Sequence, residues 1–353
     1  MKWYNPQKSP FKIYGFPFYE EDGVYRRMPL SPKAELPEAV YNLSNETAGG
    51  QIRFHAKLKE LHLEVSLAAK PGHFNHVRSP HLAEVCKQSF DLYLSKDGKE
   101  FIFYDVSKNM TPDNNKYYVR KLLELEEAEE FDVLLNFPTY GGVDKVLIGV
   151  DDDAVITEPV YKFKTDKNIV IYGSSVQQGS SASRPGMALS PLLSRWLDME
   201  VYDLGFNSSG KGEKEVATVI KDIKDTAALI INIEGNCPTS EWLDEKLREF
   251  IKEYRATNPD TPIVILPFIV SGMDILTPSK LKRRMQDREI QKKIAEDFAK
   301  EGDKNIYALV IDDTLEDNRI WYEMTVDGLH YTDLGFYHIT NEIYKFLKEK
   351  ILK

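Results

Sequence analysis

A serine bounded by glycines follows the first strongly apolar run in the second half of the chain. The run 168–172 is short and mostly β-branched, which predicts a strand buried on both faces. Gly173, Ser174 and Ser175 follow it, and a helical pattern begins at Met187. A strand that turns into a helix at the carboxyl edge of a sheet presents a small side chain to a crevice, beside free backbone N–H groups. Ser175 could serve there as a nucleophile, although a glycine-bounded turn with two exposed serines fits the same stretch.

An Asp and a His three residues apart stand directly before the last helical pattern of the chain. On one loop, the Asp327 carboxylate can hold one ring nitrogen of His330 while the other nitrogen points into the crevice. Such a pair makes a serine nucleophilic near neutral pH, because the His accepts the proton and the Asp fixes its tautomer and stabilises the imidazolium. Surface pairs with this spacing are common, so the prediction depends on both segments lying at the same sheet edge as Ser175.

Two further loops could donate hydrogen bonds to a developing oxyanion. The second predicted strand ends in the loop 205–210, and the third ends in Gly235 and Asn236. In a parallel sheet, both would lie on the same carboxyl edge as Ser175. A backbone N–H of the 205–210 loop and the Asn236 amide could flank the oxygen, and losing one such donor typically costs about 2.7–4 kcal/mol of transition-state stabilisation. The alternative for Asn236 is an Asx turn that closes the strand end.

The elements that must position these residues are short apolar runs alternating with amphipathic helical patterns. The runs are 169–172, 201–204, 228–233, 263–267 and 306–311, and the helical patterns include 213–222, 240–254, 280–300 and 334–351. This alternation predicts an α/β domain with a doubly wound parallel sheet, covered by helices on both faces. The pattern changes within 151–165, so we expect two domains, residues 1–160 and 161–353.

Residues 1–160 are expected to form an all-β domain, a sandwich or jelly roll. Apolar and polar residues alternate at 52–58 and again at 61–67, a period typical of half-buried strands. Hairpin turns are indicated around Gly98 and at 140–142. Many short strands joined by such turns favour these two all-β architectures.

The totals exclude several classes of protein. The 353 residues carry a net charge of −10, which argues against a nucleic-acid partner. No run approaches the ~20 apolar residues that span a bilayer, and the N-terminus lacks the apolar core of a signal peptide. Cys86 and Cys237 alone give no disulfide framework. A cytoplasmic location fits, although a trimmed signal sequence would leave the same pattern, and the oligomeric state stays open.

Together, the four blocks resemble the SGNH hydrolases, the GDSL-type esterases and lipases. Residues 173–179, the 205–210 loop, Gly235-Asn236 and Asp327-x-x-His330 occur in that family's order. The resemblance implies that Ser175 is the nucleophile and His330 the base. It further implies that Asp327 orients His330, and that the Asn236 side chain and the N–H of Ser175 bind the oxyanion.

Two positions depart from the family's pattern. Ser174 replaces the usual Asp before the nucleophile, and we expect little effect because that Asp is not a triad member. Ser208 occupies the place of the second block's oxyanion-hole Gly, so the N–H survives but a Cβ appears where the chain must approach substrate. A shifted alignment gives this role to Gly210 instead, and the two alternatives stay open. Cys237, where an Asp often stands, is expected to be a packing residue.

The front half also resembles a known domain. Residues 89–93, Ser-Phe-Asp-Leu-Tyr, are similar to the Gly-x-Asp-Leu-Tyr motif of the β-sandwich that precedes the hydrolase domain in one esterase subgroup. The run 177–186 is similar to the same subgroup, and within it Gln178 and Arg184 are candidate substrate-binding residues. Arg184 could bind a polar acyl or sugar group, or it could anchor the loop by bonding carbonyls.

Two other patterns could indicate different chemistry. Residues 205–211 fit the first seven positions of a phosphate-binding P-loop, but Gly212 stands where Ser or Thr must bind Mg²⁺, which disfavours an NTPase. His73, His76 and His81 are close enough for a metal site, yet no Cys or carboxylate cluster completes it, so we expect none. The same loop, with Arg78, could instead reach over the crevice and shape the substrate pocket.

The sequence thus predicts a serine esterase that works by two-step acyl transfer, with no cofactor or metal. By family resemblance, the substrate is expected to be a small acyl ester, particularly an acetyl group on a carbohydrate. Two alternatives remain: an acyltransferase that uses the same site, and a non-catalytic carbohydrate-binding protein. The presence of Ser175, Asn236, Asp327 and His330 together argues against the last.

Overall fold

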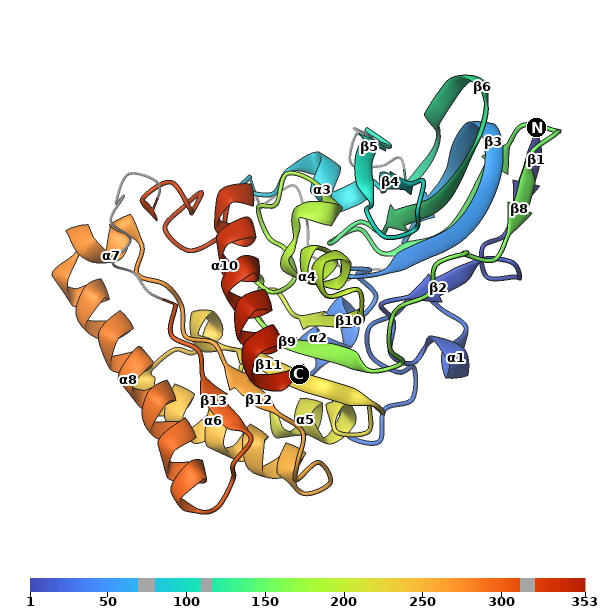
Figure 1. Cartoon of the computed structure of the whole chain (residues 1–353). Helices are drawn as coiled ribbons and strands as arrows, with labels where there is room; N and C mark the ends of the chain where they lie inside the picture. The colour runs from blue at the N-terminus through green and yellow to red at the C-terminus, as the bar shows by residue number, and fades with distance from the viewer. Residues whose placement is uncertain (69–79, 109–115, 312–320, 353) are drawn as a thin grey trace.

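Two β-sheets organise the structure, a computed structural model that describes residues 1–68, 80–108, 116–311 and 321–352 (Figure 1). The first sheet belongs to the front of the chain and is antiparallel, with the order β1-β7-β3-β6-β4-β5, while β2 and β8 also pair with β3. Its strands are β1 (Lys2–Tyr4), β2 (Lys12–Tyr14), β3 (Gln51–Leu67), β4 (Asp91–Ser95), β5 (Ile102–Val106), β6 (Tyr117–Asn136), β7 (Val143–Val150) and β8 (Val155–Thr157). The front half, predicted to be an all-β sandwich or jelly roll, contains an antiparallel β-sheet, and hydrogen bonds join its eight described strands into one sheet.

The two predicted strands at 52–58 and 61–67 are one long, curved strand, β3 (Figure 1). Pairing between β3 and β6 is irregular between Leu58 and His62. There the buried apolar positions change from even to odd numbers, so Leu58 and Leu61 both face the core. An irregularity of this kind lets a strand bend while the same face stays buried.

Only one of the two predicted hairpins forms. Strands β4 and β5 pair antiparallel around the turn that contains Gly98, as expected. Strands β6 and β7 flank β3 and pair with it on opposite sides. The turn at 140–142 therefore joins strands that are not neighbours, and the hairpin predicted there is wrong.

The second sheet is parallel, with the order β10-β9-β11-β12-β13. Its strands are β9 (Asn168–Gly173), β10 (Glu200–Gly205), β11 (Thr226–Asn232), β12 (Ile263–Ile265) and β13 (Ile306–Ala308). The predicted parallel sheet is therefore present, built from the five apolar runs. The order reverses at β9, whose neighbours are the next two strands of the chain, and ligands of open α/β sheets bind at the carboxyl ends of strands beside such a reversal.

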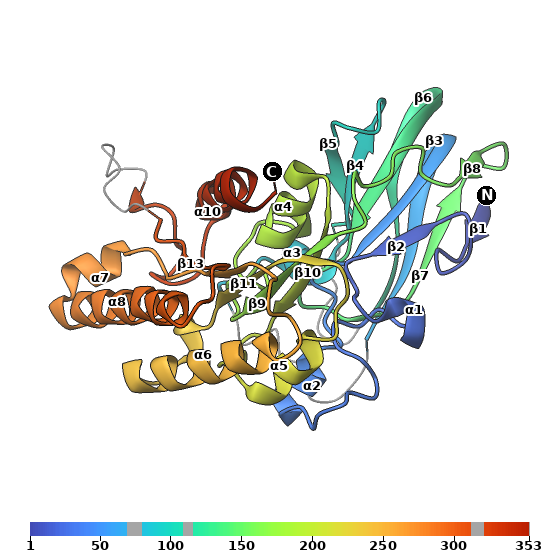
Figure 2. The ribbon, with the colours of Figure 1, turned by 60° about the horizontal axis from the view of Figure 1, so that its bottom comes forward.

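Helices lie on both sides of the parallel sheet (Figure 2). Alternate residues of β9 point to opposite faces, with Ile169 and Ile171 in one apolar cluster and Val170 and Tyr172 in the other. The first face is covered by α4 (Leu189–Leu197) and α10 (Asp333–Phe346), and the second by α5 (Lys214–Ile220), α6 (Ser240–Arg255) and α8 (Pro278–Lys300). Shorter elements are α1 (Tyr19–Asp22), α2 (Glu38–Leu43), α3 (Glu84–Gln88), α7 (Gly272–Leu276), the 3₁₀ turns η2 (Pro185–Met187) and η3 (Glu234–Asn236), and the π-helical turn η4 (Leu347–Ile351).

Part of the front half is built into the core of the α/β sheet. Met28, Leu36, Val40 and Leu43 are buried in the same apolar cluster as β9, β10, β11, α5 and α6. The segment that carries α2 therefore acts as a further covering layer of the parallel sheet. Within the described ranges, no helix is long and apolar enough to cross a membrane.

Candidate active site

Ser175 lies in a tight turn directly after β9, at the carboxyl edge of the parallel sheet. The N–H groups of Gln178 and Ser180 donate to the carbonyls of Ser174 and Ser175, at 3.2 and 3.0 Å. The N–H of Ser174 donates to Oε1 of Gln177 at 3.0 Å, which closes the turn from the side. Ser175 is 5% exposed. The turn thus places the hydroxyl of Ser175 at the carboxyl edge of the sheet, with little exposure to solvent.

The predicted Asp and His meet this serine. Oγ of Ser175 lies 2.9 Å from Nε2 of His330, and Nδ1 of His330 lies 2.8 Å from Oδ2 of Asp327. The other carboxylate oxygen, Oδ1, accepts the N–H groups of His330 and Leu329 at 2.9 and 3.1 Å. Burial alone would raise the pKa of Asp327, but these hydrogen bonds and the interaction with the His330 ring lower it below the ordinary value. A carboxylate held ionised against Nδ1 fixes the tautomer in which Nε2 can accept a proton.

A narrow loop carries both Asp327 and His330. The N–H of Val326 donates to the carbonyl of His330 at 2.8 Å, and Thr332 caps the N-terminus of α10. Gly328 turns the chain with φ of +83°, and a Cβ on it would lie 2.6 Å from the side chain of Met273. The turn therefore needs glycine for its backbone angle as well as for space. The loop is fixed at both ends, which holds the imidazole over Ser175.

Asn236 joins the two predicted oxyanion loops. It lies in η3, directly after β11, and its Nδ2 donates to the carbonyl of Ser209 and, at 3.4 Å each, to those of Phe206 and Gly210. The side chain thus bonds to the 206–210 loop, which follows β10. The residues that follow β9, β10 and β11 are therefore neighbours at the carboxyl edge of the sheet.

Ser208 and Gly210 have similar backbone angles but differ in burial and packing. Both have positive φ, +55° and +64°. Gly210 is buried, and a Cβ there would lie 2.0 Å from the carbonyl oxygen of Gly173 at the end of β9. Ser208 is exposed at the rim. Close backbone packing thus accounts for the glycine at 210, whereas a non-glycine residue is held in the left-handed region at 208.

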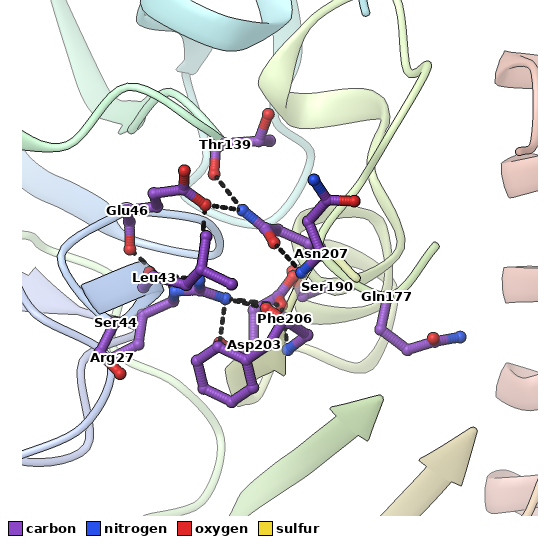
Figure 3. A network of polar contacts seen from close by, with 12 residues as sticks. Arg27, Leu43, Ser44, Glu46, Thr139, Gln177, Ser190, Asp203, Phe206 and Asn207 are labelled. Atoms are coloured by element: carbon purple, nitrogen blue, oxygen red, sulfur yellow. Dashed lines mark hydrogen bonds and ion pairs between the residues drawn. The ribbon is translucent and has the colours of Figure 1, made fainter. Parts of the chain in front are cut away.

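A buried charge network supports the 206–210 loop from below (Figure 3). The guanidinium of Arg27 donates to the carbonyls of Gly205, Glu46 and Leu43, and it lies 3.8 Å from Oδ1 of Asp203 and 4.0 Å from Oε2 of Glu46. Burial raises the pKa of Glu46 to about 8 and that of Asp203 to about 6, although Arg27 opposes both shifts. Residues of the front half thus fix the end of β10.

Gln178 belongs to this network. Its side chain is fully buried, and Nε2 donates to Oε2 of Glu46 and, at 3.3 Å, to the carbonyl of Thr139. Oε1 accepts the N–H of Asn207 at 2.9 Å. Both polar atoms of this candidate substrate-binding residue are therefore engaged with the protein, and the side chain links the turn that contains Ser175 to the 206–210 loop.

Arg184 is engaged by the front half. It forms a 3.0 Å ion pair with Asp91 and donates to the hydroxyl of Tyr93, two residues of the motif noted in the sequence. The same Asp91 oxygen accepts the N–H of Gly186 at 2.6 Å, and Asn136 donates to the other oxygen. Of the two roles considered for Arg184, this arrangement corresponds to anchoring of the loop, with a carboxylate and a phenol as partners in place of carbonyls.

His81 is a site residue whose contact the sequence analysis did not identify. Its ring stacks on that of His330, with ring centroids 4.5 Å apart and an interplanar angle of 11°. In the sequence, His81 belongs to a loop that contains three histidines. The possibility that this loop reaches over the crevice was the one sign of a contact with His330. His73, His76 and Arg78 lie outside the described residues.

His81, Asp327 and His330 also place potential metal-ligating atoms within 4.8 Å of one another. In His330, however, both ring nitrogens already have partners, Ser175 and Asp327. Imidazole nitrogens bind metal through lone pairs in the ring plane. Because the two rings are nearly parallel, these lone pairs do not converge on one point between them. The trio is therefore arranged for hydrogen bonding and stacking.

A cavity of ≈ 540 Å³ opens beside Asp327. One wall consists of Gly235, Asp327 and Leu329, and the opposite wall of residues from α7 and the start of α8. In that wall Arg284 pairs with Glu234 and Asp274, and Arg283 pairs with Asp287. The lining of the cavity is mixed, because these charged side chains stand beside Cys237, Met273 and Leu329.

Comparisons with known proteins bear on this geometry. A model of the GDSL-like Lipase/Acylhydrolase family matches residues 166–348, and the GxDLY model, described as the N-terminus of Esterase_SGNH_hydro-type, matches residues 1–156. None of the curated proteins searched matches the sequence.

Several solved structures share the architecture of the whole chain. A protein from Bacteroides ovatus, assigned as a GDSL-like lipase, is 28% identical, with a TM-score of 0.86 over 99% of this chain and 97% of that one. A salicylyl-acyltransferase from a tetracycline biosynthetic pathway is 16% identical, with a TM-score of 0.69 over 99% and 97%. An acetyl xylan esterase from the rumen bacterium Butyrivibrio proteoclasticus is 12% identical, with a TM-score of 0.55 over 99% of both chains.

Proposed function

Because this chain belongs to the GDSL-like lipase/acylhydrolase family and is an esterase-type hydrolase, we propose that it hydrolyses esters of small acyl groups by a Ser–His–Asp acyl-enzyme mechanism. One observation carries this proposal: an uninterrupted series of hydrogen bonds from Oγ of Ser175 through His330 to Asp327, at 2.9 and 2.8 Å. A serine hydroxyl bonded to an imidazole that is itself oriented by a carboxylate is the arrangement that acyl transfer requires.

The proposed reaction has two steps. Oγ of Ser175 attacks the ester carbonyl while Nε2 of His330 accepts its proton, and the tetrahedral intermediate collapses when His330 protonates the leaving alcohol. Water then attacks the acyl-enzyme by the same route, with His330 as the base again. Asp327 stays ionised throughout and stabilises the imidazolium.

We assign oxyanion binding to the N–H groups of Ser175 and Ser208 and to Nδ2 of Asn236. The Asn236 amide carries two hydrogens, which the carbonyls of the 206–210 loop share, and in this assignment one of them turns to the oxyanion when substrate binds. Ser208 is preferred to Gly210 because it lies exposed at the rim, while Gly210 is packed against the carbonyl of Gly173. Donors held by the protein before reaction stabilise the oxyanion without further reorganisation.

An acetyl ester of a carbohydrate is the proposed substrate class. The charged side chains in the cavity beside Asp327, among them Lys280 and Arg283, are compatible with a hydroxyl-rich alcohol. The likeness to an acetyl xylan esterase concerns the fold, and it is compatible with this substrate class. In this proposal residues 161–353 carry the chemistry and residues 1–160 support and shape the site, chiefly through Asp91, Tyr93 and Glu46.

Transfer of the acyl group to another alcohol is the alternative, because the same residues would catalyse it. The fold of the whole chain is similar to that of a salicylyl-acyltransferase, which is compatible with this alternative. A role in carbohydrate binding without catalysis is disfavoured, since binding alone requires no bonded Ser–His–Asp series.

Hydrolysis of p-nitrophenyl esters of increasing chain length and of acetylated sugars tests the proposal. We expect acetate to be the best acyl group and Ser175→Ala to lose activity by at least about 10³-fold. Ser174→Ala is the matched control, because that neighbouring hydroxyl bonds Gln177 and not His330. Full activity in Ser175→Ala would reject the mechanism. Acyl products formed with an added alcohol, in preference to free acid, would favour the transferase.

A further inference from the structure

We propose that His81 is a positioning residue for His330, supplied by the front half of the chain, and that it acts through a neutral ring stacked on the imidazole. The inference rests on the proposed function, in which His330 is the general base. It assigns a role in the reaction to a residue outside the four blocks that carry the Ser–His–Asp site.

Stacking of His81 restricts a motion of the His330 ring that its two hydrogen bonds allow. His330 is held at both ring nitrogens, by Ser175 on one side and Asp327 on the other. These two in-plane bonds still allow the ring to tilt about the line that joins the nitrogens. A second ring lying flat against one face, 4.5 Å away and at 11°, blocks that tilt.

His81 is itself mounted on a fixed support. Leu82 and Cys86 are buried, and Cys86 belongs to the apolar cluster that contains α4 and α10. The carbonyl of Cys86 accepts the N–H of Thr139 at 3.0 Å, and that of Lys87 accepts the N–H of Gly141 at 2.6 Å. Helix α3, which follows His81, is thus held by the loop after β6 and by the α/β core, so the backbone on the C-terminal side of His81 has a fixed support.

The charge state of His81 suits this role. Burial lowers its pKa below the ordinary value, and the electrostatic interactions with His330 and Lys87 lower it further, while Asp327 opposes them. Lys87 pairs with Glu84. His81 is therefore uncharged at neutral pH and presents the face of an aromatic ring. When His330 takes the proton of Ser175, that face lies against a cation, which is a favourable contact.

Two variants distinguish stacking from acid–base chemistry: one removes the ring of His81, and the other replaces it with a ring that cannot titrate. We expect His81→Ala to lower kcat for p-nitrophenyl acetate about tenfold, with KM changed less than about twofold. His81→Phe, which keeps the flat face, should retain kcat within about threefold. His62→Ala is the matched control, because His62 lies on β3 and bonds Glu60. Equal kcat in wild type and His81→Ala, or equal losses in His81→Ala and His81→Phe, would overturn the inference.

A pair of charged variants tests the proximity of residue 81 to the base independently. A Lys at this position disfavours the imidazolium of His330, and a Glu favours it. The acid limb of kcat/KM should therefore move to lower pH in His81→Lys and to higher pH in His81→Glu, by at least about half a unit each, below the 1–3 units of a close charge pair. A purely structural role would leave the limb where it is. Unmoved limbs in both variants would overturn the inference.

The proposed esterase mechanism and the role of His81 can be tested separately. If Ser175→Ala and His330→Ala keep their activity, the proposed function fails and no role of His81 in it remains. If both are inactive while the His81 variants match wild type in kcat and in pH dependence, the esterase mechanism stands and only the present inference is overturned. Thermal melting of each variant shows whether a loss reflects unfolding.

Discussion

Asp91 and Arg184 form a buried ion pair of 3.0 Å that joins strand β4 of the antiparallel sheet to the loop that follows Ser175. The Asp91 side chain is fully buried, and that of Arg184 is 18% exposed. The contact links the two halves of the chain within the loop that begins at Ser175. It also explains why an Asp and a Tyr occur together in a β-strand of the front domain.

Breaking this ion pair should lower the stability of the protein and kcat, while KM changes little. In Arg184→Ala the Asp91 carboxylate stays buried with only the Gly186 N–H and Asn136 as donors. We expect a loss of roughly 3 kcal/mol in the free energy of unfolding, and a fall in kcat with KM changed less than about threefold. Denaturant unfolding and steady-state kinetics measure these. A selective rise in KM at unchanged stability would instead show that Arg184 binds substrate.

The carboxylate of Asp327 should matter for both rate and acid stability. Asp327→Asn keeps the shape of the site but favours the wrong tautomer of His330, so we expect kcat to fall about 10³–10⁴-fold. The pKa of Asp327 is lowered in the folded protein, so its stabilising contribution is present at neutral pH and is lost as pH falls through that lowered pKa, below the ordinary value of 3.8. Melting curves from pH 7 to pH 3 should therefore converge for wild type and Asp327→Asn. A constant gap over this range would contradict the assignment.

Asn236 should act on the transition state and not on binding. Asn236→Ala removes one proposed oxyanion donor, and we expect kcat to fall about 10²–10³-fold with little change in KM. It also removes the bonds to the carbonyls of Phe206, Ser209 and Gly210. Asn236→Asp is the comparison, because it retains the size but places a negative charge against the oxyanion. An Asp variant as active as wild type would rule out the donor role.

The two positive-φ residues of the second loop should respond in opposite directions. Ser208→Gly relieves an L-residue at φ of +55° and should raise the free energy of unfolding by up to about 1 kcal/mol with activity retained. Gly210→Ala forces a Cβ to within 2.0 Å of the Gly173 carbonyl and should destabilise the protein strongly. Thermal melting of both variants measures this. Equal tolerance at the two positions would show that the loop is not packed as described.

The buried network around Arg27 should make stability fall with rising pH. The pKa of Glu46 is raised in the fold to about 8, so its contribution is complete below its ordinary value of 4.5 and is lost as pH rises through about 8. Glu46→Gln mimics the neutral carboxyl and should remove this dependence. We therefore expect the melting temperature of wild type, relative to Glu46→Gln, to fall between pH 5 and pH 8. A parallel pH profile would contradict a raised pKa.

Local patterns predicted some of these features, and non-local contacts decided the rest. The five apolar runs gave the parallel strands because buried strands have a clear composition. That β6 pairs with β3 and not with β7 could not be seen, since partner choice depends on residues far apart in the chain. The spacing of Asp327 and His330 suggested their bond, but the stacking of His81 involves a distant segment with no motif of its own. The ion pair of Arg184 could not be seen either, because its partner Asp91 lies 93 residues away in the chain.

The apolar side chains of Met28, Leu36, Val40 and Leu43 fill the cluster beneath β9, β10 and β11, with Arg27 bonded to the end of β10. A fragment starting at residue 161 would expose this surface to water and lose the support of the 206–210 loop. The α/β half is therefore not an interchangeable module. Gene fusion or domain shuffling could carry this hydrolase into a new protein only together with its front partner, so the two are expected to be inherited as one unit.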